Sequence, residues 1–220
     1  MRLELQVEGR ESPRSVVHAL FSSAIRIVID CLQRMVEKTV EKWGHLDYAV
    51  NDAGISGRFA PFDQLKIEEF DKVMNVDFRG TMLSLHAEIQ QFVKQGKVGS
   101  VVNISSNGAM LAADTMSPYI TAKTAVIGLT KSVAMDYADT KIRVNSVAPG
   151  TVHTAMTAPV FDDQTPGSFG QQLKKMLPAK RYGEPQEIGQ AAYFLASDNA
   201  SYINGVVLVA DACGSVGTKG

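Results

Sequence analysis

Two side chains at helical spacing, Tyr119 and Lys123, have the clearest chemical potential in this 220-residue chain. Residues four apart in a helix project from the same face, so the phenol and the ammonium would lie within reach of each other. A phenol titrates near about 10 in model peptides, and a nearby cation favours its ionised form. The spacing therefore predicts an acid/base pair in which Lys123 assists proton transfer by Tyr119.

Two further polar residues are expected at the same place. Ser106 ends a short apolar run that is typical of a buried strand, and its hydroxyl could hold a carbonyl or carbinol oxygen at the end of that strand. Asn75, in the helical stretch before it, could fix a water molecule or the lysine. The group predicts proton transfer to or from a small molecule that contains oxygen.

The elements that must position these residues are short strands alternating with longer helices. From residue 44 onward, short apolar runs alternate with amphipathic ones, which indicates a parallel sheet with helices on its faces. The expected strands span 46–51, 100–105, 143–148 and 205–210, and the expected helices span 67–94, 118–137 and 186–196. Ligands bind outside the carboxyl ends of such strands, so we expect the irregular insertion 151–181 to form a substrate lid.

The composition limits the classes of partner. The chain carries 22 Lys and Arg against 23 Asp and Glu, and this balance argues against nucleic acid as a partner. Two distant cysteines and four histidines show no metal-ligand spacing, which predicts reduced thiols and no metal site. The apolar stretch 16–29 is too short to span a membrane. We therefore expect a soluble, cytoplasmic protein that binds a small molecule and neither nucleic acid nor membrane.

Several motifs in a fixed order strengthen this interpretation. They are 47–54 (DYAVNDAG), 75–76 (NV), 101–106 (VVNISS), 119–123 (YITAK), 143–150 (RVNSVAPG) and 183–188 (GEPQEI). Together they resemble the short-chain dehydrogenase/reductase family, over about residues 33–211. The resemblance implies an α/β, Rossmann-like parallel sheet with helices on both faces, NAD or NADP as cofactor, and a homodimer or homotetramer.

The resemblance also implies a role for each site residue. Tyr119 would be the catalytic acid/base, Lys123 would lower its pKa and hold the nicotinamide ribose, and Ser106, rather than Ser105, would orient the substrate oxygen. Asn75 would support a proton relay through water. Besides Tyr119 and Lys123, the cofactor would be bound by Asn51, Asp52, Ala53, Gly54, Pro149, Gly150, Val152 and Thr154.

The N-terminal region departs from the family. The glycine-rich loop T-G-x-x-x-G-x-G, which cradles the cofactor pyrophosphate, has no counterpart, because the first fifty residues contain only Gly9 and Gly44. We expect one domain over 1–220, with an atypical segment at 1–45 that includes a helix running toward Trp43. The N-terminal part of the sheet would be truncated or remodelled. In addition, Asp52 replaces the second asparagine of the family's N-N-A-G, and its charge would be unhelpful near a pyrophosphate.

Three functions remain open at this point. The first is an oxidoreductase that interconverts a carbonyl and a secondary alcohol of a small, hydrophobic molecule with NAD(P). The second is a cofactor-independent isomerase, cyclase or lyase that uses the same Ser-Tyr-Lys site, and the third is a non-catalytic binding or assembly module. A first segment of about 30 residues that is not the natural one is a further alternative to a remodelled N-terminus.

Overall fold

The computed structural model describes residues 25–163 and 165–217, and a parallel sheet forms its centre. Within these residues the sheet has four strands in the order β1-β2-β3-β4, all parallel. The strands are β1 (Tyr48–Asn51), β2 (Gly99–Ile104), β3 (Ile142–Pro149) and β4 (Val207–Ala210). Their ends differ from the expected ones by two residues or fewer, and the prediction of a Rossmann-like α/β fold is confirmed.

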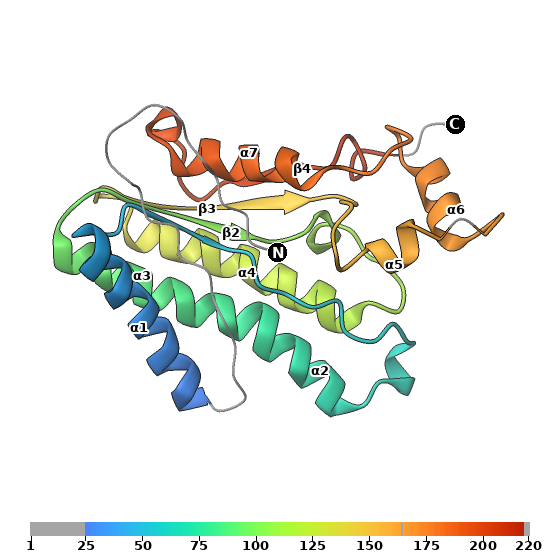
Figure 1. Ribbon diagram of the computed structural model, residues 1–220, viewed down its shortest axis with the longest axis horizontal. Coiled ribbons are helices and arrows are strands. Elements are labelled where there is room, and N and C mark those ends of the chain that lie inside the picture. The colour runs from blue at the N-terminus through green and yellow to red at the C-terminus, as the bar shows by residue number, and fades with distance from the viewer. Residues whose placement is uncertain (1–24, 164, 218–220) are drawn as a thin grey trace.

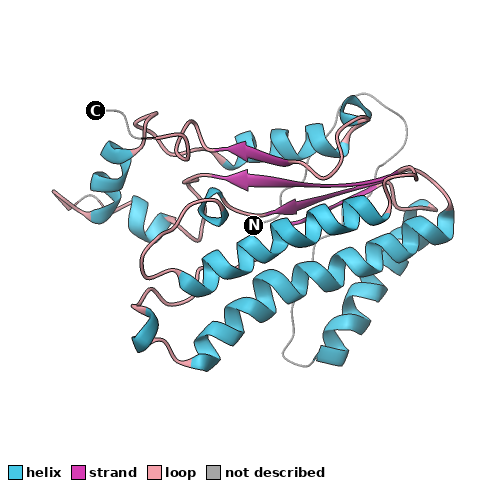
Figure 2. Cartoon of the chain, turned by 180° about the vertical axis from the view of Figure 1, so that it is seen from behind, coloured by secondary structure: helices cyan, strands magenta, loops and turns pink. Residues whose placement is uncertain are grey.

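Helices cover both faces of this sheet, as Figures 1 and 2 show. On one face lie α3 (Gly80–Gln95) and α4 (Ser117–Asp136), with α1 (Ile25–Trp43) packed against α3. The other face is covered by α7 (Pro185–Ala196). Every residue of β2 is buried, which explains why its sequence is an apolar run rather than an alternating pattern.

The long helical stretch expected at 67–94 is present as three consecutive pieces. It comprises α2 (Ile67–Val73), a π-helical turn (Met74–Arg79) and α3. Its buried face repeats at four-residue intervals through Val73, Asp77 and Thr81, and a carboxylate therefore lies among side chains that are otherwise neutral. π-helical turns occur frequently at functional sites.

The insertion after β3 lies beyond the carboxyl end of that strand, where Figure 1 shows α5 and α6. These short helices span Ala158–Phe161 and Phe169–Met176. The insertion is anchored where Val152 pairs with Gly183 and where the rings of Phe161 and Tyr182 stack with centroids 3.9 Å apart. The segment thus stands at the edge of the sheet where a ligand is expected.

The N-terminal expectation is tested only in part. The helix expected to run toward Trp43 is α1, which begins at Ile25. Residues 1–24 lie outside the described residues, so the truncation or remodelling of the sheet stays a prediction. In the part of the chain that the structure describes, no helix has both the length and the apolar character needed to cross a bilayer.

Candidate active site

Ser106, Tyr119 and Lys123 meet at the carboxyl end of β2. Ser106 follows that strand by two residues, while α4 carries the other two side chains on one face. The Ser106 hydroxyl faces the Tyr119 phenol and acts to lower its pKa, and Lys123 Nζ lies 5.7 Å from the centroid of the tyrosine ring. The structure thus brings together the three residues that the motifs singled out.

The two adjacent serines have different partners. Ser105 Oγ donates a hydrogen bond to the backbone oxygen of Lys123 at 2.9 Å and so ties β2 to α4. Ser106 Oγ accepts a hydrogen bond from the backbone N–H of Gly108 at 3.1 Å and faces the phenol. Ser105 is therefore placed to support the fold, and Ser106 is placed to contact a ligand.

Lys123 is buried and lies beside a carboxylate of opposite charge. Its Nζ donates a hydrogen bond to the backbone oxygen of Ile104 at 3.0 Å and lies 3.8 Å from Oδ2 of Asp77. Burial lowers the pKa of Lys123, whereas the carboxylates of Asp77 and Asp52 act in the opposite direction. The Asp77 carboxylate is therefore the near counter-charge of the lysine.

The electrostatics of Tyr119 differ from the expectation. Its pKa is raised above the ordinary value, because burial disfavours the phenolate and the charges of Asp77 and Asp52 disfavour it further. The hydrogen bond from Ser106 opposes this and lowers the pKa. The sequence predicts that Lys123 lowers this pKa, but in the structure the charge of the lysine is offset by Asp77, whose Oδ2 lies 3.8 Å from Lys123 Nζ.

Asn75 does not join this group. It is exposed on the π-helical turn, while Asp77, two residues later, is completely buried against Lys123. The physical reason is helical phase, because Asp77 lies four residues from both Val73 and Thr81 on the buried face. A carboxylate on an otherwise neutral buried stripe is the signal that the sequence analysis missed.

The loop after β1 contributes backbone rather than side chains. Gly54 passes so close to the ion pair that a Cβ there would lie 3.1 Å from Asp77 Oδ2 and 3.3 Å from Lys123 Nζ. Asp52 is exposed, and Ala53 is half-buried. Asn51, expected to bind cofactor, is instead buried, and its Nδ2 donates to Glu88 Oε2 at 3.1 Å. Its side chain is therefore hydrogen-bonded within the protein interior.

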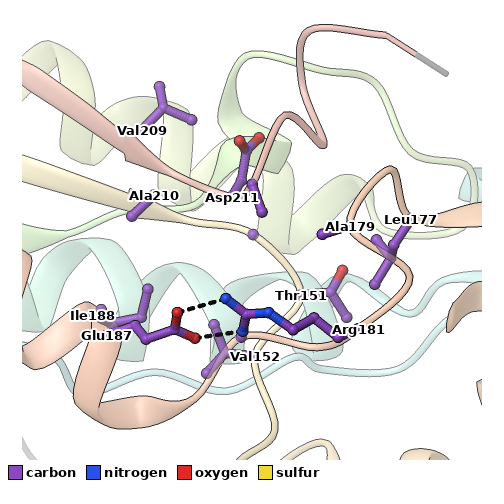
Figure 3. A pocket seen from close by; sticks show the side chains of 13 residues that line it. Thr151, Val152, Leu177, Ala179, Arg181, Glu187, Ile188, Val209, Ala210 and Asp211 are labelled. Atoms are coloured by element: carbon purple, nitrogen blue, oxygen red, sulfur yellow. Dashed lines mark hydrogen bonds and ion pairs between the residues drawn. The ribbon is translucent and has the colours of Figure 1, made fainter. Parts of the chain in front are cut away.

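A cavity of about 310 Å³ opens beside the carboxyl ends of β3 and β4. Figure 3 shows Thr151 and Val152 on one side of it and Asp211 on another, with the Arg181–Glu187 pair between the insertion and α7. The two guanidinium–carboxylate hydrogen bonds of this pair are both 2.7 Å long. Most of the other lining side chains are aliphatic: Leu177, Ala179, Ile188, Val209, Ala210 and Ala212.

The second group of expected cofactor residues borders this cavity. Pro149 is the last residue of β3, Gly150 donates its N–H to the oxygen of Ala210 at 3.0 Å, and Val152 pairs with Gly183. Gly150 and Val152 line the cavity. Thr154 lies further along, where its N–H donates to Thr157 Oγ1 at 2.8 Å.

These features fit one half of a nicotinamide dinucleotide. Gly54 lets the backbone approach the Asp77–Lys123 pair more closely than a residue with a side chain would allow, and the cavity lies beside the ends of β3 and β4. They suit a ribose hydroxyl and a flat carboxamide ring. The sequence holds no T-G-x-x-x-G-x-G loop for the pyrophosphate, so the fit concerns the nicotinamide end alone.

Known proteins resemble this chain over most of its length. A family model described as enoyl-(acyl carrier protein) reductase matches residues 29–214. The 2-(R)-hydroxypropyl-CoM dehydrogenase of Xanthobacter autotrophicus is 36% identical over 217 residues, which cover 95% of this chain and 85% of that protein.

Solved structures agree with these relatives. Levodione reductase is 35% identical, with a TM-score of 0.80 over 86% of this chain and 74% of its own. The structure of ElxO with NADP bound is 30% identical, with a TM-score of 0.80 over 86% of this chain and 75% of its own. These names favour the oxidoreductase among the three functions left open. The chain belongs to the short-chain dehydrogenase/reductase family of oxidoreductases.

Proposed function

We propose that this protein interconverts a carbonyl group and a secondary alcohol of a small, hydrophobic molecule, with NAD or NADP as the redox partner. The observation that carries the proposal is the meeting of Ser106, Tyr119 and Lys123 at the carboxyl end of β2, with Gly54 packed against Lys123. The redox chemistry of the relatives supports the same conclusion.

In the direction of reduction, Tyr119 acts as the acid. Its phenol donates a proton to the carbonyl oxygen, and the Ser106 hydroxyl, which faces the phenol, donates a hydrogen bond to that same oxygen. Lys123 stabilises the phenolate that remains. NAD(P)H, when bound, supplies the hydride, and Gly54 and Lys123 would hold its nicotinamide ribose.

The substrate class follows from the residues around the site. The insertion 151–181, which borders the cavity, carries the apolar side chains of Met156, Phe169 and Met176, which are 51%, 70% and 69% exposed. We propose that this insertion is a lid whose apolar side chains close over the substrate. Removal of water by such a lid strengthens the electrostatic interactions inside the site.

The proposal is tested with purified protein and both reduced cofactors. NADH and NADPH are titrated separately while nicotinamide fluorescence is followed, and their oxidation is then measured with a panel of cyclic and aliphatic ketones. We expect saturable binding of at least one cofactor and turnover that favours apolar ketones. Absence of binding at millimolar NADH and NADPH would refute a redox function.

We propose, on the resemblance alone, that the protein forms a homodimer or homotetramer. Analytical ultracentrifugation of the purified chain tests this directly. A monomer across the micromolar range would contradict it.

A further inference from the structure

Asp77 is a buried carboxylate that the proposed chemistry does not use. It is completely buried, and only its Oδ1 has a hydrogen-bond donor, the backbone N–H of Ile55 at 2.9 Å. Its Oδ2 has no hydrogen-bond partner within the described residues and lies 3.8 Å from Lys123 Nζ. A buried carboxylate is costly unless a cation compensates it, so Asp77 and Lys123 stabilise each other.

The ionisable groups around Tyr119 form a small set. They are Lys123 on α4, Asp77 on the π-helical turn and Asp52 in the loop after β1. The two residues that directly follow β2, Ser105 and Ser106, carry no charge. Of the two carboxylates, Asp77 is buried and Asp52 is exposed, so water screens Asp52 far more strongly.

We propose that Asp77 is a positioning residue that holds the Lys123 ammonium and competes with the Tyr119 phenolate for it, so that at neutral pH the site keeps Tyr119 protonated, the form that donates a proton to a carbonyl. The lysine carries a single positive charge, which can balance only one of the two anions. While Asp77 is ionised, the Tyr119 phenolate is a second buried anion beside a single cation. Without Asp77, the phenolate becomes the only buried anion near Lys123.

The inference rests on the proposed function for its catalytic consequence, but its electrostatic part stands alone. Asp77→Asn removes the charge and keeps an oxygen that can accept from the Ile55 N–H. The ionisation of Tyr119 is followed by near-ultraviolet absorbance across pH, as the difference between each protein and its Tyr119→Phe counterpart. We expect Asp77→Asn to lower the pKa of Tyr119 by about one unit. An unchanged or higher value would overturn the inference.

Two matched variants separate charge from shape. Asp77→Glu keeps the charge and should leave the Tyr119 pKa near the wild-type value, while Asp52→Asn removes an exposed charge and should lower it by less than half as much. A shift of equal size in Asp52→Asn would also contradict the inference. If Asp77→Asn does not fold, as judged by circular dichroism, Asp77→Ser carries the same prediction in a smaller side chain.

Turnover then tests the catalytic consequence. The apparent pKa in the pH profile of alcohol oxidation should fall by the same amount in Asp77→Asn, so that oxidation at pH 7 is up to about tenfold faster than in the wild type. The absorbance titration requires neither substrate nor cofactor. If the pKa of Tyr119 falls in Asp77→Asn but no protein shows turnover, the proposed function alone is refuted. If turnover is present but the pKa of Tyr119 is unchanged in Asp77→Asn, the role of Asp77 alone is refuted.

Discussion

At the scale of single residues, the adjacent serines divide two tasks between them. Ser106 faces the phenol, and Ser105 bonds to the backbone of Lys123. The hydroxyl of Ser106 would donate to the substrate oxygen, where negative charge develops during the reaction. Loss of one such donor costs about a hundredfold or more in rate.

The serines therefore predict a contrast between two alanine variants. Ser106→Ala should lower kcat about a hundredfold with little change in the free energy of unfolding. Ser105→Ala should cost about 1 kcal/mol of stability, because a buried backbone oxygen loses its donor, and should affect kcat less. Steady-state kinetics and urea denaturation measure the two effects. A loss of stability in Ser106→Ala together with a hundredfold loss of kcat in Ser105→Ala would contradict the geometry.

The sequence identified part of this site and missed part of it. Ser106, Tyr119 and Lys123 were accessible because motif order and the four-residue helical spacing place them without knowledge of the fold. The motifs predict a role for Asn75, which is exposed in the structure, and they give no sign of the buried Asp77, because burial follows the phase Val73, Asp77, Thr81. The raised pKa of Tyr119 depends on distances in space, which no spacing in sequence provides.

At the scale of elements, Arg143 joins β3 to the end of α7. This arginine is 8% exposed, and its guanidinium donates to the backbone oxygens of Leu195 at 2.8 Å and Ser197 at 3.0 Å, with longer bonds to Ile203 and Ala196. Carbonyl groups at a helix C-terminus lack partners within the helix and carry partial negative charge. Arg143 thus caps α7 from inside the molecule.

Replacement of this arginine by lysine should be costly although the charge is kept. An ammonium cannot reach several carbonyl groups with the planar fork of a guanidinium. We expect Arg143→Lys to lower the free energy of unfolding by about 2 kcal/mol, as measured by chemical denaturation. Lys141→Arg, at an exposed position just before β3, is the matched control and should have little effect. Equal stability of Arg143→Lys and wild type would disprove the capping role.

The elements themselves were largely predictable. Continuous apolar runs identified all four strands, because strands covered on both faces lack polar alternation. The helices α4 and α7 were expected within one residue of their observed bounds. The π-helical turn was not predicted, since apolar residues recur at helical spacing on both sides of it and the sequence indicates one helix over 67–94.

At the scale of the whole molecule, a buried acid links stability to pH. Glu88 on α3 is completely buried, and burial raises its pKa from 4.5 to about 7 despite a hydrogen bond from Asn51. Its Oε1 and the Oδ1 of Asn51 lack hydrogen-bond partners within residues 25–163 and 165–217. Two neighbouring acceptors without donors indicate that Glu88 is protonated in the folded protein at acidic pH.

The sign of the effect follows from the raised pKa. The contribution of protonated Glu88 to the free energy of unfolding is fully present below about pH 4.5 and is lost as the pH rises through 7. The reason is that Glu88 loses its proton near pH 4.5 in the unfolded chain but only near pH 7 in the folded protein. The loss amounts to about 3 kcal/mol. Glu88→Gln should therefore match wild type near pH 4 and exceed its stability by a similar amount at pH 8, in urea titrations at both values. A difference between the two proteins that does not vary with pH would contradict this linkage.

The interior network includes Asn51, a residue of one of the motifs. Asn51 stands in a motif expected to bind cofactor, yet its Nδ2 donates to Glu88 Oε2 and to Asn103 Oδ1, both within the core. A motif identifies a residue but does not show whether its side chain binds a ligand or stabilises the fold. Only the three-dimensional partners of Asn51 separate the two.

The central claim is that Tyr119 transfers the proton in an NAD(P)-dependent carbonyl reduction. It is tested most directly by the rate of NAD(P)H oxidation, with the best ketone of the panel, in Tyr119→Phe and in Tyr202→Phe. The second variant is a matched control at a fully exposed tyrosine. We expect Tyr119→Phe to lose about a thousandfold in kcat while it still binds NAD(P)H, and Tyr202→Phe to keep the wild-type rate. Wild-type turnover by a folded Tyr119→Phe protein would contradict the account.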